Sequence, residues 1–416
     1  MRGRPSFAVV VAALAALTTL SAQSRPDRWV TTWTTAQELV APTGPPRPAR
    51  QKGPEASNLP PSLADQTVRM VAHVSLGGRR LRVELSNMLN AQPLEIGAAH
   101  LAIAKVGGEI AGGTGRILTF GGSATFTIPP GVVAVTDPVD LEVAPLADLA
   151  VSVYLPHDTG VPASHTVGLH TGYISKGNVA GSRSMLEPTA LFAYAWLAGI
   201  DVAASSGAYT IVALGDSITD GFATTRDANL AWPALLAKRL KENQSTQQVA
   251  VVNQGISGNQ VLRDGAGISA LARLDRDVLT RPGVKWVILF EGINDINLRT
   301  RPGGANPLTT EELIGGYRQI IERCHAQGIQ VMGATLTPSL GVPTYSDHGE
   351  EIRVAANRWI REKGNFDAVV DFEAVLRDPQ HPAKLRPELD PGDHIHPNDA
   401  GNQMMADAFD LQIFKK

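Results

Sequence analysis

Short apolar runs separated by longer amphipathic segments fill the second half of this sequence, and they restrict the possible folds more than any other feature. The runs cover residues 211–214, 249–252, 286–290, 329–332 and 368–370. Segments between them, such as 232–240 and 311–327, have the apolar spacing of helices. Apolar runs that alternate with helices are typical of parallel strands buried on both faces. The pattern therefore predicts an α/β domain with a parallel sheet over residues 206–416.

The first half follows a different pattern, which predicts a β-rich accessory domain over residues 25–205. Apolar and polar residues alternate over 81–86 and again over 149–155, as they do on strands with one buried face. We expect Gly77 and Gly78 to close a hairpin between the first of these strands and the segment 67–75. Many short strands with little helical pattern favour a β-sandwich or a jelly roll.

Two segments of the first half have the composition of connections. Residues 42–61 are rich in proline, which predicts an exposed loop. Residues 199–207 are rich in alanine, serine and glycine, and we interpret them as the linker between the two domains. Trp29 and Trp33 do not form a ladder with a third aromatic residue, so we expect them to be packing anchors.

The N-terminus has the features of a secretory signal peptide over residues 1–24. Arg2 and Arg4 precede an apolar run over 7–20, and small residues follow at Ser21, Ala22 and Ser24. The run is short for a membrane span. We therefore expect a secreted protein, extracellular or periplasmic, without stable membrane insertion; the alternative is an uncleaved anchor.

Composition limits the partners and the covalent chemistry. With 43% hydrophobic residues, a chain of 416 residues can build an ample core. The net charge of -3 gives no basic surplus, so we expect no nucleic-acid partner. Cys324 is the single cysteine, which excludes an intramolecular disulfide. It lies in an apolar helical pattern with Ile320 and Ile321, so we expect a buried, inert thiol.

Four short polar motifs carry the chemistry. They lie at residues 215–219 (Gly-Asp-Ser-Ile-Thr), 255–259, 292–295 and 393–396. Ser217 comes just after an apolar run, at the strand end where open α/β sheets place their ligands. A serine hydroxyl needs a general base to act as a nucleophile, and an imidazole oriented by a carboxylate can supply one. Together the motifs offer a nucleophile, a base and oxyanion donors.

These motifs, in this order, resemble the SGNH or GDSL hydrolases, and the resemblance covers the chain from Tyr209 to the end. It implies a three-layer, flavodoxin-like α/β fold. It also implies a catalytic triad of Ser217, Asp393 and His396, with an oxyanion hole formed by Ser217, Gly258 and Asn294. Ile218 departs from the family name, which has leucine at that position. The change is conservative, because both side chains are apolar.

The residues around the motifs also have expected roles. We interpret Asp216 and Asp295 as acceptors for backbone N–H groups. We expect Pro397 to open a helix whose inward face is formed by Ala400, Met404 and Ala408. Asp393, His394 and His396 could also ligate a metal, but no further ligand set accompanies them, so we expect neither a metal nor another cofactor. Asn294 alone could be an Asx-turn, and Gly258 alone a simple turn.

The sequence therefore predicts a secreted serine ester hydrolase that acts on short-chain esters through an acyl-enzyme, with acetylated polysaccharides as a possible substrate. A lipase for longer acyl chains is the alternative within the same class. A non-catalytic carbohydrate-binding protein is the alternative from a different class, and an intact triad argues against it. The expected partner is a small-molecule or polysaccharide ester. The sequence leaves open the oligomeric state and whether the β-rich domain binds glycan or is structural.

Overall fold

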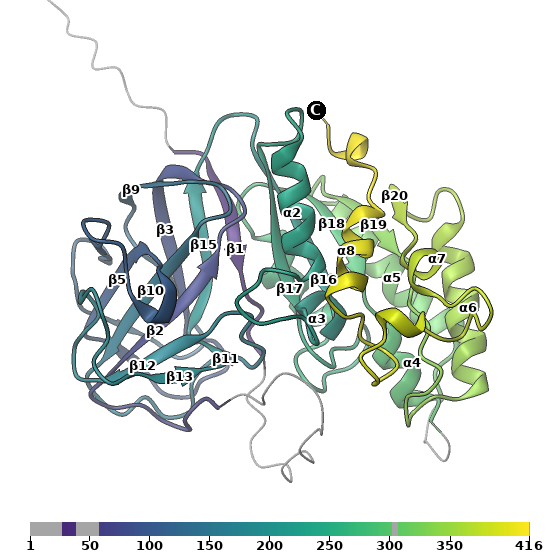
Figure 1. Cartoon of the computed structure of the whole chain (residues 1–416), viewed down its shortest axis with the longest axis horizontal. Helices are drawn as coiled ribbons and strands as arrows, with labels where there is room; N and C mark the ends of the chain where they lie inside the picture. Colours follow the sequence, from purple (N-terminus) through teal and green to yellow (C-terminus); the bar gives the residue numbers. More distant parts are fainter. Residues whose placement is uncertain (1–26, 39–57, 302–306, 416) are drawn as a thin grey trace, which may run out of the picture.

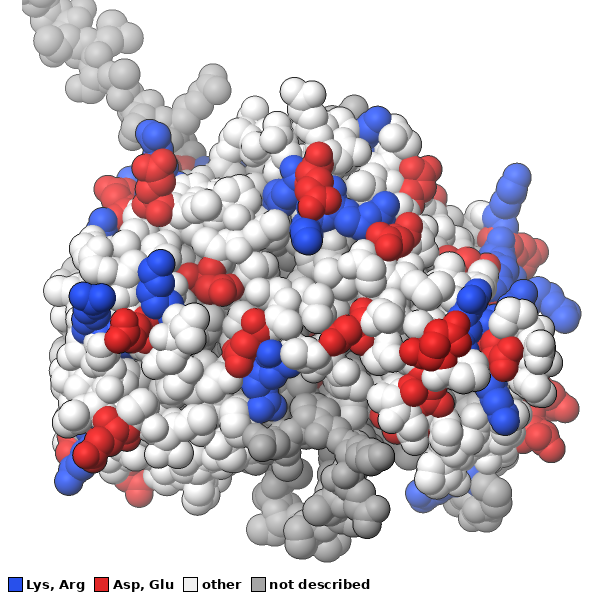
Figure 2. Space-filling model, viewed as in Figure 1, with Lys and Arg blue, Asp and Glu red and all other residues white. Residues whose placement is uncertain are grey.

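The computed structural model describes residues 27–38, 58–301 and 307–415 (Figure 1). The expected signal peptide and most of the proline-rich segment 42–61 lie outside these ranges. Within them, no helix combines the length and the apolar character that a membrane span requires. Figure 2 shows basic and acidic side chains interspersed over the viewed face, which agrees with a net charge of only -3.

An antiparallel β-region occupies the first half of the chain. One sheet has the order β1 (Trp29–Thr34), β15 (Leu197–Ala203), β3 (Gly78–Ser86) and β8 (Val133–Val135), with β9 (Val139–Val143) also paired to β3. The other has the order β13 (Thr189–Leu191), β12 (Gly172–Lys176), β2 (Gln66–His73), β10 (Asp148–Leu155), β5 (Ala98–Ile103) and β6 (Arg116–Ile117). Two short pairs complete the region: β11 (Ser164–His165) with β14 (Tyr194–Ala195), and β4 (Leu94–Ile96) with β7 (Phe126–Ile128).

Both sheets contribute to one apolar core, as the alternating pattern predicted. Leu81, Val83 and Leu85 on β3 and Val151 and Val153 on β10 are fully buried in the same cluster. Alternate residues of each strand point to one face, so two strands from different sheets meet across the core. The β-rich, sandwich-like prediction for this half is confirmed.

The predicted hairpin at Gly77 and Gly78 is wrong, because β2 and β3 lie in different sheets. Residues 74–78 carry the chain across the core from one sheet to the other. Thr32 on β1 fixes this crossing: its hydroxyl donates to the carbonyl of Leu76 at 2.8 Å and accepts the N–H of Leu76 at 2.7 Å. A Cβ on Gly77 would lie 2.2 Å from the carbonyl oxygen of Val143. The glycine thus permits close backbone packing, and the local sequence could not reveal the change of sheet.

The interpretation of residues 199–207 as a linker is also wrong for most of that segment. β15 runs through it and lies between β1 and β3 in the sheet. Ile200 and Val202 are fully buried. Asp201 is buried as well, and it accepts hydrogen bonds from Arg82 at 2.9 Å and from the Thr31 hydroxyl at 2.8 Å. These partners, distant in sequence, allow a strand that contains an aspartate to lie at the centre of the sheet.

The second half forms a five-stranded parallel sheet. Its order is β17 (Val249–Gly255), β16 (Tyr209–Gly215), β18 (Val284–Phe290), β19 (Gln330–Ala334) and β20 (Ala368–Val370). In chain order this is the 2-1-3-4-5 arrangement of flavodoxin-like folds. The apolar runs of the sequence correspond to these strands, and the predicted α/β fold is confirmed.

Helices cover the sheet in two groups, as right-handed crossovers in this strand order require. One group packs α2 (Trp232–Glu242) and α7 (Phe372–Leu376) against α8 (Asp399–Asp407). The other contains α3 (Ala270–Leu274), α4 (Ile293–Arg299), α5 (Thr310–His325) and α6 (Asp347–Arg361). Cys324 lies on α5 and is fully buried, as expected, and burial raises the pKa of its thiol to about 12.

The two regions meet along β1, which pairs with β15 and packs against β17 (Figure 1). Backbone and side-chain hydrogen bonds cross this seam. The N–H of Thr31 donates to the carbonyl of Pro282 at 2.9 Å, and the Thr210 hydroxyl donates to the carbonyl of Thr31 at 2.8 Å. Trp33 is buried there, with its ring edge-on to Tyr194 at 5.1 Å, so it is the packing anchor that the sequence predicted.

A buried ion pair between Glu84 on β3 and Arg281 also crosses the seam. Glu84→Ala would leave the guanidinium buried without its carboxylate, so we expect the free energy of unfolding to fall by about 3–5 kcal/mol. Urea denaturation measures this change. Glu142→Ala is the matched control, because its pair with Arg79 is at least 80% exposed on both sides, and it should cost less than about 1 kcal/mol. Equal losses in the two variants would contradict the structural role of the buried pair.

Candidate active site

Three of the four motifs follow neighbouring strands at the same edge of the parallel sheet. Gly215 at the end of β16 pairs with Gly255 at the end of β17 and with Phe290 at the end of β18. The chain then turns sharply into α1 (Ser217–Asp220). A Cβ on Gly215 would lie 2.5 Å from the carbonyl oxygen of Phe290. Glycine at this position therefore lets the turn pack close to the neighbouring strand and places Ser217 at the edge.

A continuous chain of hydrogen bonds joins the predicted triad. The Ser217 hydroxyl oxygen lies 2.8 Å from Nε2 of His396, and Nδ1 of His396 lies 2.6 Å from Oδ2 of Asp393. The hydrogen bond from His396 and its positive charge when protonated outweigh the effect of burial and lower the pKa of Asp393 to about 2. An ionised Asp393 accepts a hydrogen bond from the Nδ1–H group, which leaves the lone pair of Nε2 free to accept the serine proton.

Local packing holds His396 in this orientation. The other carboxylate oxygen of Asp393 accepts the backbone N–H groups of Ile395 at 3.2 Å and His396 at 3.0 Å. The ring of Phe222, which follows α1, lies 4.5 Å from the imidazole between ring centres. Carboxylate, backbone and aromatic ring thus fix the imidazole beside Ser217.

The helix after His396 begins later than the sequence predicted. Asn398 caps α8 by accepting the N–H of Gly401 at 3.1 Å, so Pro397 lies before the helix. The inward face is correspondingly rotated. The residues buried on α8 are Gly401, Asn402, Met405 and Ala406. Of the predicted inward face, Met404 and Ala408 are partly buried against the core and Ala400 is exposed. The strong preference of asparagine for the cap position explains the shift.

The two remaining predicted donors lie next to each other. Gly258 is in a turn with φ of +84°, and no hydrogen bond among the described residues uses its N–H. Asn294 is the second residue of α4, and its side-chain amide donates to the carbonyl of Asn259 at 2.9 Å. A primary amide carries two hydrogens, so the second one is available to a further acceptor. The arrangement provides two donors beside the edge that carries Ser217.

Asp216 and Asp295 accept backbone N–H groups, as predicted. Asp216 accepts that of Ile218 at 3.0 Å, and Asp295 accepts those of Val261 at 2.7 Å and Leu262 at 3.1 Å. Burial raises the pKa of Asp216 to about 7 and that of Asp295 to about 6. These carboxyls hold the turns that carry the first and second motifs.

Arg273 on α3 also organises the site, a role that the sequence analysis did not predict. Its guanidinium is buried and donates to the carbonyl oxygens of Gly215 at 3.1 Å and Gln254 at 2.7 Å. It also donates to the side-chain oxygen of Asn259 at 3.0 Å. Arg273 therefore ties the ends of β16 and β17 to the turn after Gly258. The single available signal was an arginine inside an apolar helical segment.

The structure does not join His394 to the triad. His394 points at Asp390, with Nδ1 2.6 Å from Oδ2, and about half of its side chain is exposed. His394 and His396 thus contact different carboxylates. Among the described residues, the groups with metal-ligating geometry are His73 with Asp148 and His170, and Glu38 with His165 and Asp220. Neither group includes Asp393, His394 or His396.

If the Asn294 amide donates to the oxyanion, Asn294→Ala should lower kcat by about 10²- to 10³-fold and change KM much less. The negative charge forms only in the transition state, so ground-state binding hardly uses this hydrogen bond. Asn294→Asp should be at least as damaging, since it places a carboxylate against the developing anion. Steady-state kinetics on an activated ester measure the effect. Asn297→Ala, which removes a buried asparagine of the same helix, is the control. Wild-type kcat in Asn294→Ala would remove Asn294 from the oxyanion hole.

Residues 213–404 match the model of the GDSL-like Lipase/Acylhydrolase family. No curated protein matches the chain. Similar solved structures include a putative lipolytic protein of the G-D-S-L family from Desulfitobacterium hafniense DCB-2 (25% identity, 48% of this chain and 96% of that one, TM-score 0.36). They also include the aryl esterase of M. smegmatis (17% identity over 50% of this chain and 98% of that one, TM-score 0.40). A third is an acetylxylan esterase from Geobacillus stearothermophilus (23% identity over 51% of this chain and 95% of that one, TM-score 0.39). On the strength of the family match, this chain contains a GDSL-like lipase/acylhydrolase domain and is a carboxylic ester hydrolase.

Proposed function

We propose that the protein is a secreted serine esterase that hydrolyses short-chain carboxylic esters through an acyl-enzyme on Ser217. The observation that carries this proposal is the hydrogen-bonded chain from Ser217 through His396 to Asp393. This chain also argues against a non-catalytic carbohydrate-binding protein, which would have no need of an aligned triad.

The geometry suggests the following sequence of steps. His396 accepts the hydroxyl proton through Nε2 as Ser217 Oγ attacks the ester carbonyl, and Asp393 stabilises the imidazolium. The N–H groups of Ser217 and Gly258 and the amide of Asn294 stabilise the tetrahedral oxyanion. The intermediate collapses, the C–O bond breaks, and the alcohol leaves with the proton from His396. Water, deprotonated by the same imidazole, then hydrolyses the acyl-serine and releases the acid.

A short acyl group suits the surface near the motifs. Lipases for long chains need apolar surface beside the nucleophile. Among the exposed large apolar side chains of the described residues, Leu298 alone lies on a helix that also carries a proposed site residue. Aromatic residues make up only 5% of the chain. We propose acetyl esters, including those on polysaccharides, as the substrate class, with longer acyl esters as the alternative.

A series of p-nitrophenyl esters separates these substrates. We expect kcat/KM to be highest for acetate or butyrate and to fall for octanoate and dodecanoate. Release of acetate from acetylated xylan and pectin tests the polymer. Ser217→Ala should lower kcat by about 10⁴- to 10⁶-fold with the fold retained, and a serine-directed phosphonate should label the wild type at Ser217. A maximum at octanoate or longer would support the lipase alternative, and labelling at another serine would reject the mechanism.

Export is part of the same proposal and rests on Arg2, Arg4 and the apolar run over residues 7–20. We expect the mature protein to lack about its first 22 to 24 residues, because signal peptidases cut after small residues such as those at 21–24. N-terminal sequencing of protein recovered outside the cytoplasm measures the cleavage site directly. Protein that stays in the cytoplasm and retains Met1 would exclude export.

A further inference from the structure

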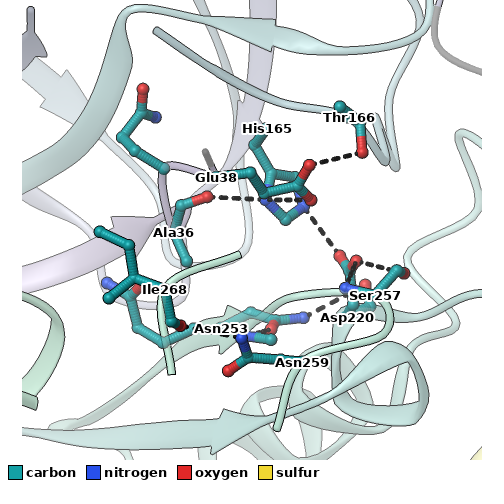
Figure 3. Close-up of polar contacts among 12 residues, drawn as sticks. Ala36, Glu38, His165, Thr166, Asp220, Asn253, Ser257, Asn259 and Ile268 are labelled. Carbon is teal, nitrogen blue, oxygen red and sulfur yellow. Dashed lines mark hydrogen bonds and ion pairs between the residues drawn. The ribbon is translucent and has the colours of Figure 1, made fainter. Parts of the chain in front are cut away.

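A histidine of the β-region reaches the active-site edge of the parallel sheet. His165 on β11 has only 4% of its side chain exposed. Its Nε2 lies 2.9 Å from Oδ1 of Asp220, the last residue of α1, and its Nδ1 lies 2.8 Å from the carbonyl oxygen of Ala36 (Figure 3). The β-region thus places a titratable side chain against the helix that begins with Ser217.

The contacts of His165 favour the imidazolium form of its ring. The carbonyl of Ala36 carries no proton, so Nδ1 of His165 must donate. At Nε2 the partner is a carboxylate, and imidazole is the stronger base of the two. Burial alone would lower the pKa of His165, but the charge and hydrogen bond of Asp220 and the charge of Glu38 raise it to about 9.

Glu38 completes a buried cluster, here called the Glu38–His165–Asp220 cluster. Its Oε1 lies 3.7 Å from Nδ1 of His165, and its Oε2 accepts the hydroxyl of Thr166 at 2.7 Å. The backbone N–H of Glu38 donates to the carbonyl of Ser164 at 2.9 Å. Burial raises the pKa of Glu38. The cluster is therefore anchored in the β-region on one side and presents its positive charge to the α/β region on the other.

Asp220 connects this cluster to the proposed oxyanion hole. Its Oδ2 accepts both the backbone N–H of Ser257 at 3.0 Å and the Ser257 hydroxyl at 2.7 Å (Figure 3). Ser257 directly precedes Gly258. One carboxylate thus receives the imidazolium on one oxygen and the oxyanion turn on the other.

We propose that His165 is a positioning residue for ester hydrolysis: through Nε2 it holds Asp220, and Asp220 holds Ser257 so that the N–H of Gly258 faces the developing oxyanion. This proposal rests on the proposed function. The β-region, on this view, is part of the catalytic apparatus.

The physical reason is the sensitivity of oxyanion stabilisation to geometry. A donor acts only when it lies at hydrogen-bond distance from the position that the oxyanion will occupy. Without His165, Asp220 would be a buried carboxylate that has lost its partner on Oδ1, so its side chain would shift. That shift alters its hydrogen bonds to Ser257 and moves the turn. The effect should appear in kcat, since the oxyanion exists only in the transition state.

His165→Gln tests the proposal, because glutamine keeps a polar side chain of similar reach but cannot carry the charge. The full-length mature protein is used, and active sites are counted by titration with a serine-directed phosphonate. We expect kcat per titrated site to fall by about 10- to 100-fold, less than for outright loss of a donor, with KM changed little. A purely structural role would reduce the number of titrated sites and leave kcat per site unchanged.

His170→Gln is the matched control. His170 is equally buried in the β-region and contacts the α/β region through Asn229, with Nε2 2.7 Å from Oδ1, but it does not contact Asp220. It should keep wild-type kcat per titrated site. Ser257→Ala provides a second test that leaves the β-region intact. If His165 acts through Ser257, the loss of kcat in the double variant should hardly exceed that of the more impaired single variant. The reason is that the effects of coupled residues are not additive.

The outcomes separate this proposal from the proposed function. A wild-type protein that neither hydrolyses esters nor labels at Ser217 would reject the function itself. If the wild type is active but His165→Gln has an unchanged kcat per titrated site, only the role of His165 would be overturned. Additive losses in the double variant would have the same meaning. If exhaustive chelation abolishes the activity of the wild type and zinc restores it, the Glu38–His165–Asp220 cluster would be a metal site. That result would also overturn the proposed role of His165.

Discussion

The site depends on how closely the chain can approach itself at the ends of β16 and β17. A Cβ on Gly255 would lie 2.2 Å from the backbone nitrogen of Asp220, and one on Gly215 would lie 2.2 Å from the hydroxyl of Thr219. With glycine at both positions, α1 packs directly on the end of β17. This contact sets Ser217 at the sheet edge and brings Asp220 to the turn after β17. Side chains at either position would push the first and second motifs apart.

Buried charged side chains stabilise the ends of β16 and β17, although each would be costly to bury alone. Arg273 donates to backbone carbonyls at both strand ends, and the nearby Glu291 is buried, with its pKa raised well above its usual value by burial and by Asp216. Such networks are favourable only when their members compensate one another. They give the motif turns a single arrangement, which oxyanion stabilisation requires.

The sequence was informative where the signal was local. The apolar runs predicted the strands of the parallel sheet, and the residue types at the strand ends predicted the backbone contacts of Asp216 and Asp295. It failed where the partner was distant. Neither the crossing at Gly77 nor the central strand through Asp201 could be predicted, because each depends on β1, more than a hundred residues away from Asp201. His165 has no motif around it, and its significance comes entirely from Asp220. The start of α8 was predicted one residue or more too early, because Asn398 is the N-cap and Pro397 lies before the helix.

The position of β1 has a consequence for the order in which the molecule can assemble. Trp29 pairs with Ala203, and Thr31 donates to the carbonyl of Pro282. The first described strand to leave the ribosome must therefore wait for residues far along the chain, and contacts of such high sequence separation form slowly. The contact between Thr31 and Pro282 can form during synthesis only after β16 and β17 of the parallel sheet have been made. Truncation after the β-region would leave β1 without the surface it packs on, so the two halves should fold as one cooperative unit.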